Sequence, residues 1–93
     1  MAVCLIMQFG VLTVDKYDEI MRTLDLDRTG WPDGQISHTA GAGSEGLFVV
    51  DLWQTREQFE HFLETRLKPA FAKVGGIPQP RVTAFPVHNR HVP

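Results

Sequence analysis

The stretch LFVVDLWQTREQFEHFLETRLKPAF, residues 47–71, contains two successive patterns that decide the fold. Its opening LFVVDLW is almost wholly apolar, with β-branched and aromatic side chains, and predicts a strand. Thr55 and Gln58 then have the spacing of a capping box, which marks the start of a helix. The helix that follows carries one apolar stripe, formed by Phe59, Phe62, Leu63, Leu67, Ala70 and Phe71.

Pro69 falls inside this helical pattern. Proline lacks the backbone N–H that a continuous helix needs, so we expect a break near Lys68 and a short second helical piece to Val74. Gly75 and Gly76 then end the helix.

The residues on either side supply the other elements. We expect, in chain order, a strand at 2–11, an amphipathic helix at 14–27 capped by Thr13 or Asp15, a loop at 27–34, a short strand at 35–40, a tight turn at 41–46, and a last strand at 80–89 interrupted by Pro86.

The order strand, helix, strand, strand, helix, strand is that of the ferredoxin-like fold. We therefore expect an α+β protein, βαββαβ, with a four-stranded antiparallel sheet and one domain over residues 1–93. In such a sheet both helices cover the same face. Residues 3–9 and 47–53 are nevertheless apolar at both parities, which predicts a homodimer that covers the second face. The alternative is a monomer with an exposed apolar sheet, which would be prone to aggregate.

The amino-acid composition limits the kinds of partner that the protein can bind. Hydrophobic residues make up 43% of the chain and charged residues 22%, as in a globular protein, and the net charge is −2 without any block of like charge. No nucleic acid is therefore expected. The single cysteine, Cys4, excludes an internal disulfide and a cysteine-based zinc cluster. The apolar amino terminus lacks a basic region and is too short to span a membrane, so we expect a cytoplasmic protein without membrane contact.

A family resemblance rests on Pro32-Asp33-Gly34 and on VVDLWQTREQFEHFLETRLKPAF, where Asp51 precedes Trp53 by two residues and Thr55 follows as a small polar cap. With these motifs the chain resembles the dimeric α/β-barrel superfamily, and within it the antibiotic biosynthesis monooxygenase-like group. The resemblance implies a homodimer. Members of the superfamily include cofactor-free oxygenases of aromatic polyketides, haem-degrading enzymes, isomerases, polyketide cyclases and proteins of no known activity, so the resemblance by itself selects no single reaction.

This sequence departs from the group in the second helix. Phe62 and Leu67 stand where members of the group often carry histidines. Both side chains are apolar, so we expect no haem or metal bound from this helix, and no cofactor.

None of the strong catalytic signatures, such as a nucleophile elbow, a phosphate loop or a two-histidine metal helix, is present in the sequence. His38, in the strand at 35–40, is the first candidate for a general base because the ordinary pKa of histidine lies near neutrality. A histidine that faces solvent, or that is hydrogen-bonded at a dimer seam, is the alternative.

Asp51 and Trp53 share one face of their strand, because they are two residues apart. The carboxylate of Asp51 is a candidate proton acceptor, and the indole of Trp53 a stacking surface for a flat ligand. Asp51 paired with Arg66 or Arg81, and Trp53 as a packing residue, are the alternatives.

Tyr17 lies on the apolar stripe of the first helix and is a candidate catalytic hydroxyl; simple core packing competes with this interpretation. Trp31 is either a lid over a cavity or an anchor for its loop. We expect Tyr17 or Arg66 to donate to a substrate anion, and Trp53, Phe59 and Phe62 to form apolar walls.

His61 lies off the apolar stripe, toward solvent. His88 and His91 form an H-x-x-H pattern, but Pro86 and Pro93 flank it and no acidic residue is near, so we expect a tail that packs on a partner subunit and no metal site.

These observations favour a cofactor-free enzyme that holds a flat, largely apolar molecule and performs an oxygenation, a cyclisation or an isomerisation. Two rivals remain. One is a module that binds the same kind of ligand without converting it, and the other is a stress-response or scaffold dimer whose cavity is filled by its own side chains.

Overall fold

The computed structural model describes all of residues 1–93. Its elements are β1 (Val3–Phe9), α1 (Val14–Leu24), α2 (Leu26–Thr29), β2 (Gln35–Gly43), β3 (Gly46–Trp53), α3 (Arg56–Phe62), the π-helical turn η1 (Leu63–Leu67), α4 (Lys68–Val74) and β4 (Arg81–Pro86). The four strands form one sheet in the order β2-β3-β1-β4, and every pair is antiparallel. This is the ferredoxin-like βαββαβ arrangement, so the expected fold class is confirmed.

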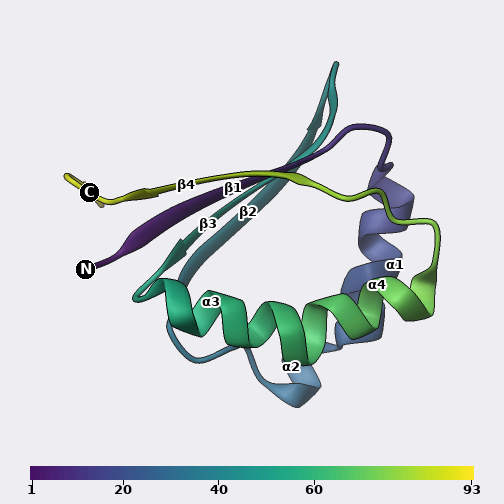
Figure 1. Cartoon of the computed structure of the whole chain (residues 1–93), viewed down its shortest axis with the longest axis horizontal. Coiled ribbons are helices and arrows are strands. Elements are labelled where there is room, and N and C mark those ends of the chain that lie inside the picture. Colours follow the sequence, from purple (N-terminus) through teal and green to yellow (C-terminus); the bar gives the residue numbers. More distant parts are fainter.

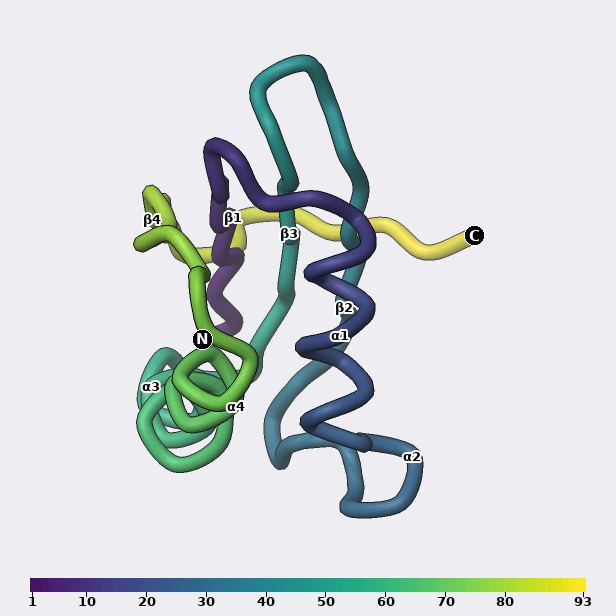
Figure 2. The backbone as a smooth tube through the Cα atoms, turned by 90° about the vertical axis from the view of Figure 1, so that its right-hand side faces the viewer, coloured from purple at the N-terminus to yellow at the C-terminus, as the bar shows by residue number.

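The helices lie on one side of the sheet (Figure 1). In Figure 2, α1 runs beside β2, while α3 and α4 form a second rod nearer to β1 and β4. The core fills the space between the helices and the sheet, and Leu5, Leu47 and Trp53 are its most completely buried large side chains. No helix combines the length and the apolar content that crossing a bilayer requires.

The second helical rod does not break at Pro69. The backbone stays helical from Arg56 to Val74, and the discontinuity is the π-helical turn η1, after which α4 begins at Lys68. Pro69 therefore falls within the first turn of α4, where its missing N–H is tolerated. The expected second helical piece to Val74 is α4, and the expected break near Lys68 is this wider turn, through which the backbone stays helical. Because a π turn has i→i+5 hydrogen bonds, it also lets Phe62 and Leu67, five residues apart, both point into the core.

Other boundaries differ by a few residues. Thr13, not Asp15, caps α1, since its hydroxyl accepts from the Lys16 N–H. The helix ends at Leu24, because Asp25 adopts a left-handed conformation with φ 51°. The stretch that we expected to be a loop opens with the single-turn helix α2, and β2 runs on to Gly43.

The face of the sheet that points away from the helices, called here the outer face, is also apolar. The register pairs Ile6 with Val50 and Cys4 with Leu52. These side chains alternate along their strands with those of the core between sheet and helices, and therefore point away from the helices. Val50 and Phe85, at 38% and 46% exposed, are the most accessible apolar side chains there. The expectation that β1 and β3 carry apolar residues to both faces is confirmed.

Candidate functional site

A polar pair stands on the helix-facing side of the sheet. His38 in β2 lies directly opposite Asp51 in β3. The Nδ1 atom of His38 is 2.7 Å from Oδ1 of Asp51. A carboxylate can only accept, so Nδ1 carries the hydrogen and donates it. In the neutral ring the other nitrogen, Nε2, therefore carries no hydrogen and can accept one.

Asp51 is 3% exposed and is the only buried charged residue. A buried carboxylate is stable only when both of its oxygens are hydrogen-bonded. Here Oδ1 accepts from His38, and Oδ2 accepts from Nε1 of Trp53 at 3.3 Å. The considered pairing of Asp51 with Arg66 or Arg81 is wrong. Arg81 stands opposite Gln8, on the other face of the sheet.

Tyr17 completes a chain of hydrogen bonds. It projects from α1, and its hydroxyl is 2.5 Å from Nε2 of His38. The two rings lie nearly parallel, with an interplanar angle of 8°. Burial, and to a lesser extent the negative charges of Asp51 and Asp18, raise the pKa of Tyr17. At neutral pH the phenol therefore stays protonated, and its hydroxyl donates a hydrogen bond to Nε2.

This hydrogen-bonded chain, Tyr17–His38–Asp51, lines an apolar cavity between the sheet and the helices. Thirteen of the sixteen lining residues are hydrophobic, and the polar remainder is Gln35, His38 and Asp51. The volume of this cavity is about 40 Å³, enough for a few water molecules. A larger molecule therefore needs one or more walls to move.

Trp31 is the wall that is most accessible to solvent. It lines the cavity, is 50% exposed, and its ring centroid lies 6.1 Å from that of His38. Its indole N–H reaches Asp27 at 3.4 Å, which is a long contact. Trp31 therefore forms the part of the cavity wall beside His38.

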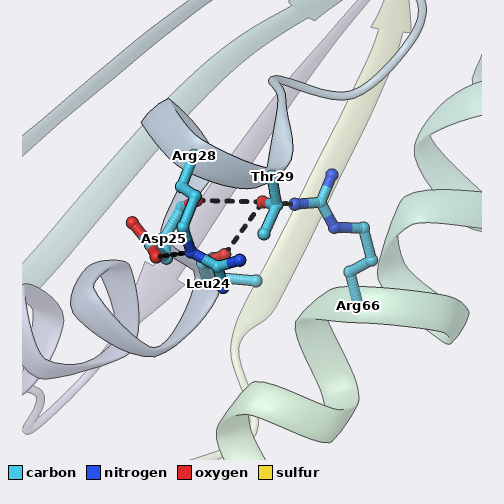
Figure 3. A network of polar contacts seen from close by, with 5 residues as sticks. All are labelled: Leu24, Asp25, Arg28, Thr29 and Arg66. Atoms are coloured by element: carbon cyan, nitrogen blue, oxygen red, sulfur yellow. Dashed lines mark hydrogen bonds and ion pairs between the residues drawn. The ribbon is translucent and has the colours of Figure 1, made fainter.

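Arg66 does not reach the cavity. Its guanidinium donates to the carbonyl of Gly30 at 2.8 Å and to the hydroxyl of Thr29. The same group lies 5.6 Å from the ring of Phe62. Figure 3 shows Arg66 extending from the second helical rod to the end of α2. Arg66 thus fastens the segment that leads into Trp31.

The remaining sequence-predicted residues divide between core, cavity and surface. Phe62 lines the cavity, whereas Trp53 and Phe59 pack edge to face in the core and do not line it. His88 and His91 are exposed in the tail after β4. The structure holds no group of three or more His, Cys, Asp or Glu side chains placed to bind a metal ion.

Gln35 lines the cavity and was not among the candidates. It stands three residues before His38, and side chains on a regular strand alternate between faces, so simple alternation puts Gln35 on the opposite face from His38.

Neither a protein-family model nor a curated protein matches the sequence. Solved structures do match. SnoaB, a cofactor-independent oxygenase from Streptomyces nogalater, aligns with a TM-score of 0.69 and 15% identity over 96% of this chain and 95% of that one. Rv0793 from Mycobacterium tuberculosis aligns with a TM-score of 0.68 and 19% identity over 99% and 100% of the two chains.

A dimeric ferredoxin-like protein of unknown function from Thermobifida fusca also aligns, with a TM-score of 0.66 and 16% identity over 94% of this chain and 92% of that one. At such identities the likeness concerns the fold and not the reaction. The chain has the ferredoxin-like fold that these proteins share, and the expected resemblance to antibiotic biosynthesis monooxygenase-like structures is confirmed for the fold alone.

Proposed function

We propose that this chain is a small-molecule enzyme that removes a proton from a flat, largely apolar substrate, without a metal or an organic cofactor. The observation that carries the proposal is the hydrogen-bonded chain Tyr17–His38–Asp51 at the wall of an apolar cavity. A base, an orienting carboxylate and a hydroxyl in one apolar site are the groups that base-initiated chemistry requires.

Each group has a separate role. Asp51 fixes the tautomer of His38 and stabilises the imidazolium that forms when Nε2 takes a proton. Tyr17 remains a neutral phenol because its pKa is raised. Its hydroxyl gives its proton to Nε2 only as its oxygen takes one from the substrate, so that the phenol stays neutral, or it turns to donate to the substrate anion. The apolar walls exclude water and strengthen both interactions.

The anion then determines the reaction. A carbanion or enolate next to an aromatic ring is electron-rich enough to react with oxygen. In that case one oxygen atom replaces two hydrogens as a new carbonyl, and the other oxygen leaves as water. Protonation at another carbon gives an isomer, and attack on a carbonyl in the same molecule gives a ring. SnoaB, described as a cofactor-independent oxygenase, supports the first course.

The test is oxygen uptake with anthrone, a flat aromatic ketone whose CH₂ group is acidic. We expect the wild-type protein to convert it to anthraquinone, and His38→Ala to lower the rate about 10²-fold or more, the usual contribution of a general base. His61→Ala, a change on the exposed face of the second helical rod, is the matched control and should leave the rate unchanged.

Thermal melting of both variants separates catalysis from folding. An unchanged rate in a folded His38→Ala protein would show that His38 is not the general base. Binding of anthrone and related aromatics without any conversion would instead favour the module that binds such ligands without changing them.

We also propose that the active form is a homodimer that covers the outer face. The support is the run of apolar side chains on that face, with Val50 and Phe85 accessible, and the structural likeness to a dimeric ferredoxin-like protein. An open apolar face of this kind favours association.

A further inference from the structure

The side-chain oxygen of Gln35, at the wall of the cavity, lacks a hydrogen-bond partner. This atom, Oε1, is buried, and it is the only buried side-chain nitrogen or oxygen in this state. Leaving a buried acceptor unpaired destabilises a protein, so nearly all such groups are paired. Because Gln35 lines the same cavity as His38 and Asp51, a bound molecule is the natural source of the missing donor.

A β-bulge is what brings Gln35 to this cavity. The register between β2 and β3 shifts between Gln35 and Ser37. As a result Gln35 stands opposite Trp53, while His38 stands opposite Asp51. Asp51 and Trp53 point to the same face, and therefore Gln35 and His38 do as well. Bulges of this kind are common beside active sites, where they redirect a side chain.

We propose that Gln35 is a specificity-determining residue whose Oε1 accepts a hydrogen bond from a hydroxyl or N–H group of the substrate. The proposal rests on the proposed function, in which His38 takes a proton from one acidic group. Gln35 then binds a second, separate donor on the same molecule. The substrate class is a flat apolar molecule with two such polar groups, since an ether or a carbonyl cannot satisfy an acceptor.

A site of this type discriminates strongly, because an analogue without the donor leaves Oε1 unpaired in the complex. Naphthol and the dihydroxynaphthalene isomers are suitable probes, since they differ by one hydroxyl group. Their binding is followed by quenching of tryptophan fluorescence, with Trp31 at the cavity wall. We expect the wild-type protein to bind at least one dihydroxy isomer about tenfold more tightly than naphthol, the effect of one well-formed hydrogen bond.

Gln35→Met keeps the length of the side chain and removes the acceptor. We expect this variant to bind the two kinds of probe with about equal affinity. Gln54→Met makes the same chemical change on an exposed side chain just beyond Trp53, and should keep the tenfold preference.

Thermal melting gives a second readout without any ligand. If Oε1 awaits a substrate donor, Gln35→Met removes an unpaired acceptor and should raise the Tm of the free protein. A Gln35 side chain that merely supports the bulge would give a lower Tm. That result would overturn the proposal, as would a wild-type protein that binds neither probe or shows no preference.

The two proposals fail separately. If anthrone oxidation depends on His38 but the dihydroxy probes are not preferred, the proposed enzymatic function is supported and the proposed role of Gln35 is contradicted. If the dihydroxy probes are preferred, Gln35→Met abolishes the preference and the protein converts nothing, Gln35 is supported as a ligand contact and the enzymatic function is contradicted.

Discussion

The ionisation of the Tyr17 hydroxyl can be used to test the geometry of the site. This hydroxyl is held against His38 and near the buried charge of Asp51, and burial is the main cause of its raised pKa. A phenolate at this position would sit in a poorly hydrated space beside a carboxylate, which is why the neutral form is favoured. Because it is the only tyrosine in the chain, its ionisation can be observed without overlap.

We therefore expect an absorbance titration at the phenolate band to give one transition, above the ordinary value of 10.0, in the folded protein. In denaturant the transition should return to about 10. Asp51→Asn removes one of the charges and should move the folded transition downward. Tyr17→Phe is the control and should abolish the signal; a folded-state transition at or below the unfolded value would contradict the placement of Tyr17.

The same shift predicts how stability depends on pH. The folded protein holds the phenol proton more tightly than the unfolded chain does, so the contribution of Tyr17 is fully present below pH 10. It is lost as the pH rises from there through the raised pKa, because the unfolded chain ionises first. Denaturant unfolding between neutral and alkaline pH should show this fall in the wild-type protein, and a shallower one in Tyr17→Phe.

At the scale of elements, the hairpin between β2 and β3 depends on one glycine. Gly46 begins β3 with φ 105°, and a Cβ there would lie 2.3 Å from the carbonyl oxygens of Phe9 and Gly10. We expect Gly46→Ala to lower the free energy of unfolding by about 2 kcal/mol or more, because both the conformation and the contact become unfavourable. Urea denaturation measures the change.

Gly10→Ala is the matched control for that experiment. It lies next to Gly46 in space, has no positive φ and meets no atom within 4 Å of a new Cβ. It should be neutral or slightly stabilising. Equal destabilisation by the two substitutions would mean that the close approach at Gly46 is not the cause.

At the scale of the whole molecule, the outer face of the sheet determines assembly. We expect the wild-type protein to sediment at twice its chain mass of 10.5 kDa at micromolar concentration. Val50→Glu places a charge in the middle of the apolar outer face, and should shift the protein toward the monomer. Val14→Glu makes the same change on the exposed start of α1 and should leave the mass unchanged. A wild-type monomer at this concentration would contradict the proposed dimer.

Much of the fold was predictable because its signals are local. The cap at Thr55, the apolar stripe after it and the glycines of the turns each involve residues within a few positions of one another. The errors were local conflicts. Pro69 predicted a break, but a first-turn position in α4 tolerates it, and the π turn before it keeps the rod continuous.

The candidate site was predictable only in part. His38, Asp51 and Tyr17 were identified by residue type, yet their contacts join positions 13 and 21 residues apart. Arg66 shows the limit of this reasoning, since the same guanidinium that suits a substrate anion instead binds the end of α2. The residue type determines which chemistry a side chain can perform, whereas the packing of the elements determines which group it contacts.

The order of the elements and the two apolar faces of the sheet follow from the amino-acid sequence, because helical and strand periodicities are written in consecutive residues. The alignment of His38 with Asp51, the burial of Tyr17 and the redirection of Gln35 arise only when the strands pair and the helices pack. A one-residue shift of register reverses the face of every following side chain, and the bulge at Gln35 makes that shift in space.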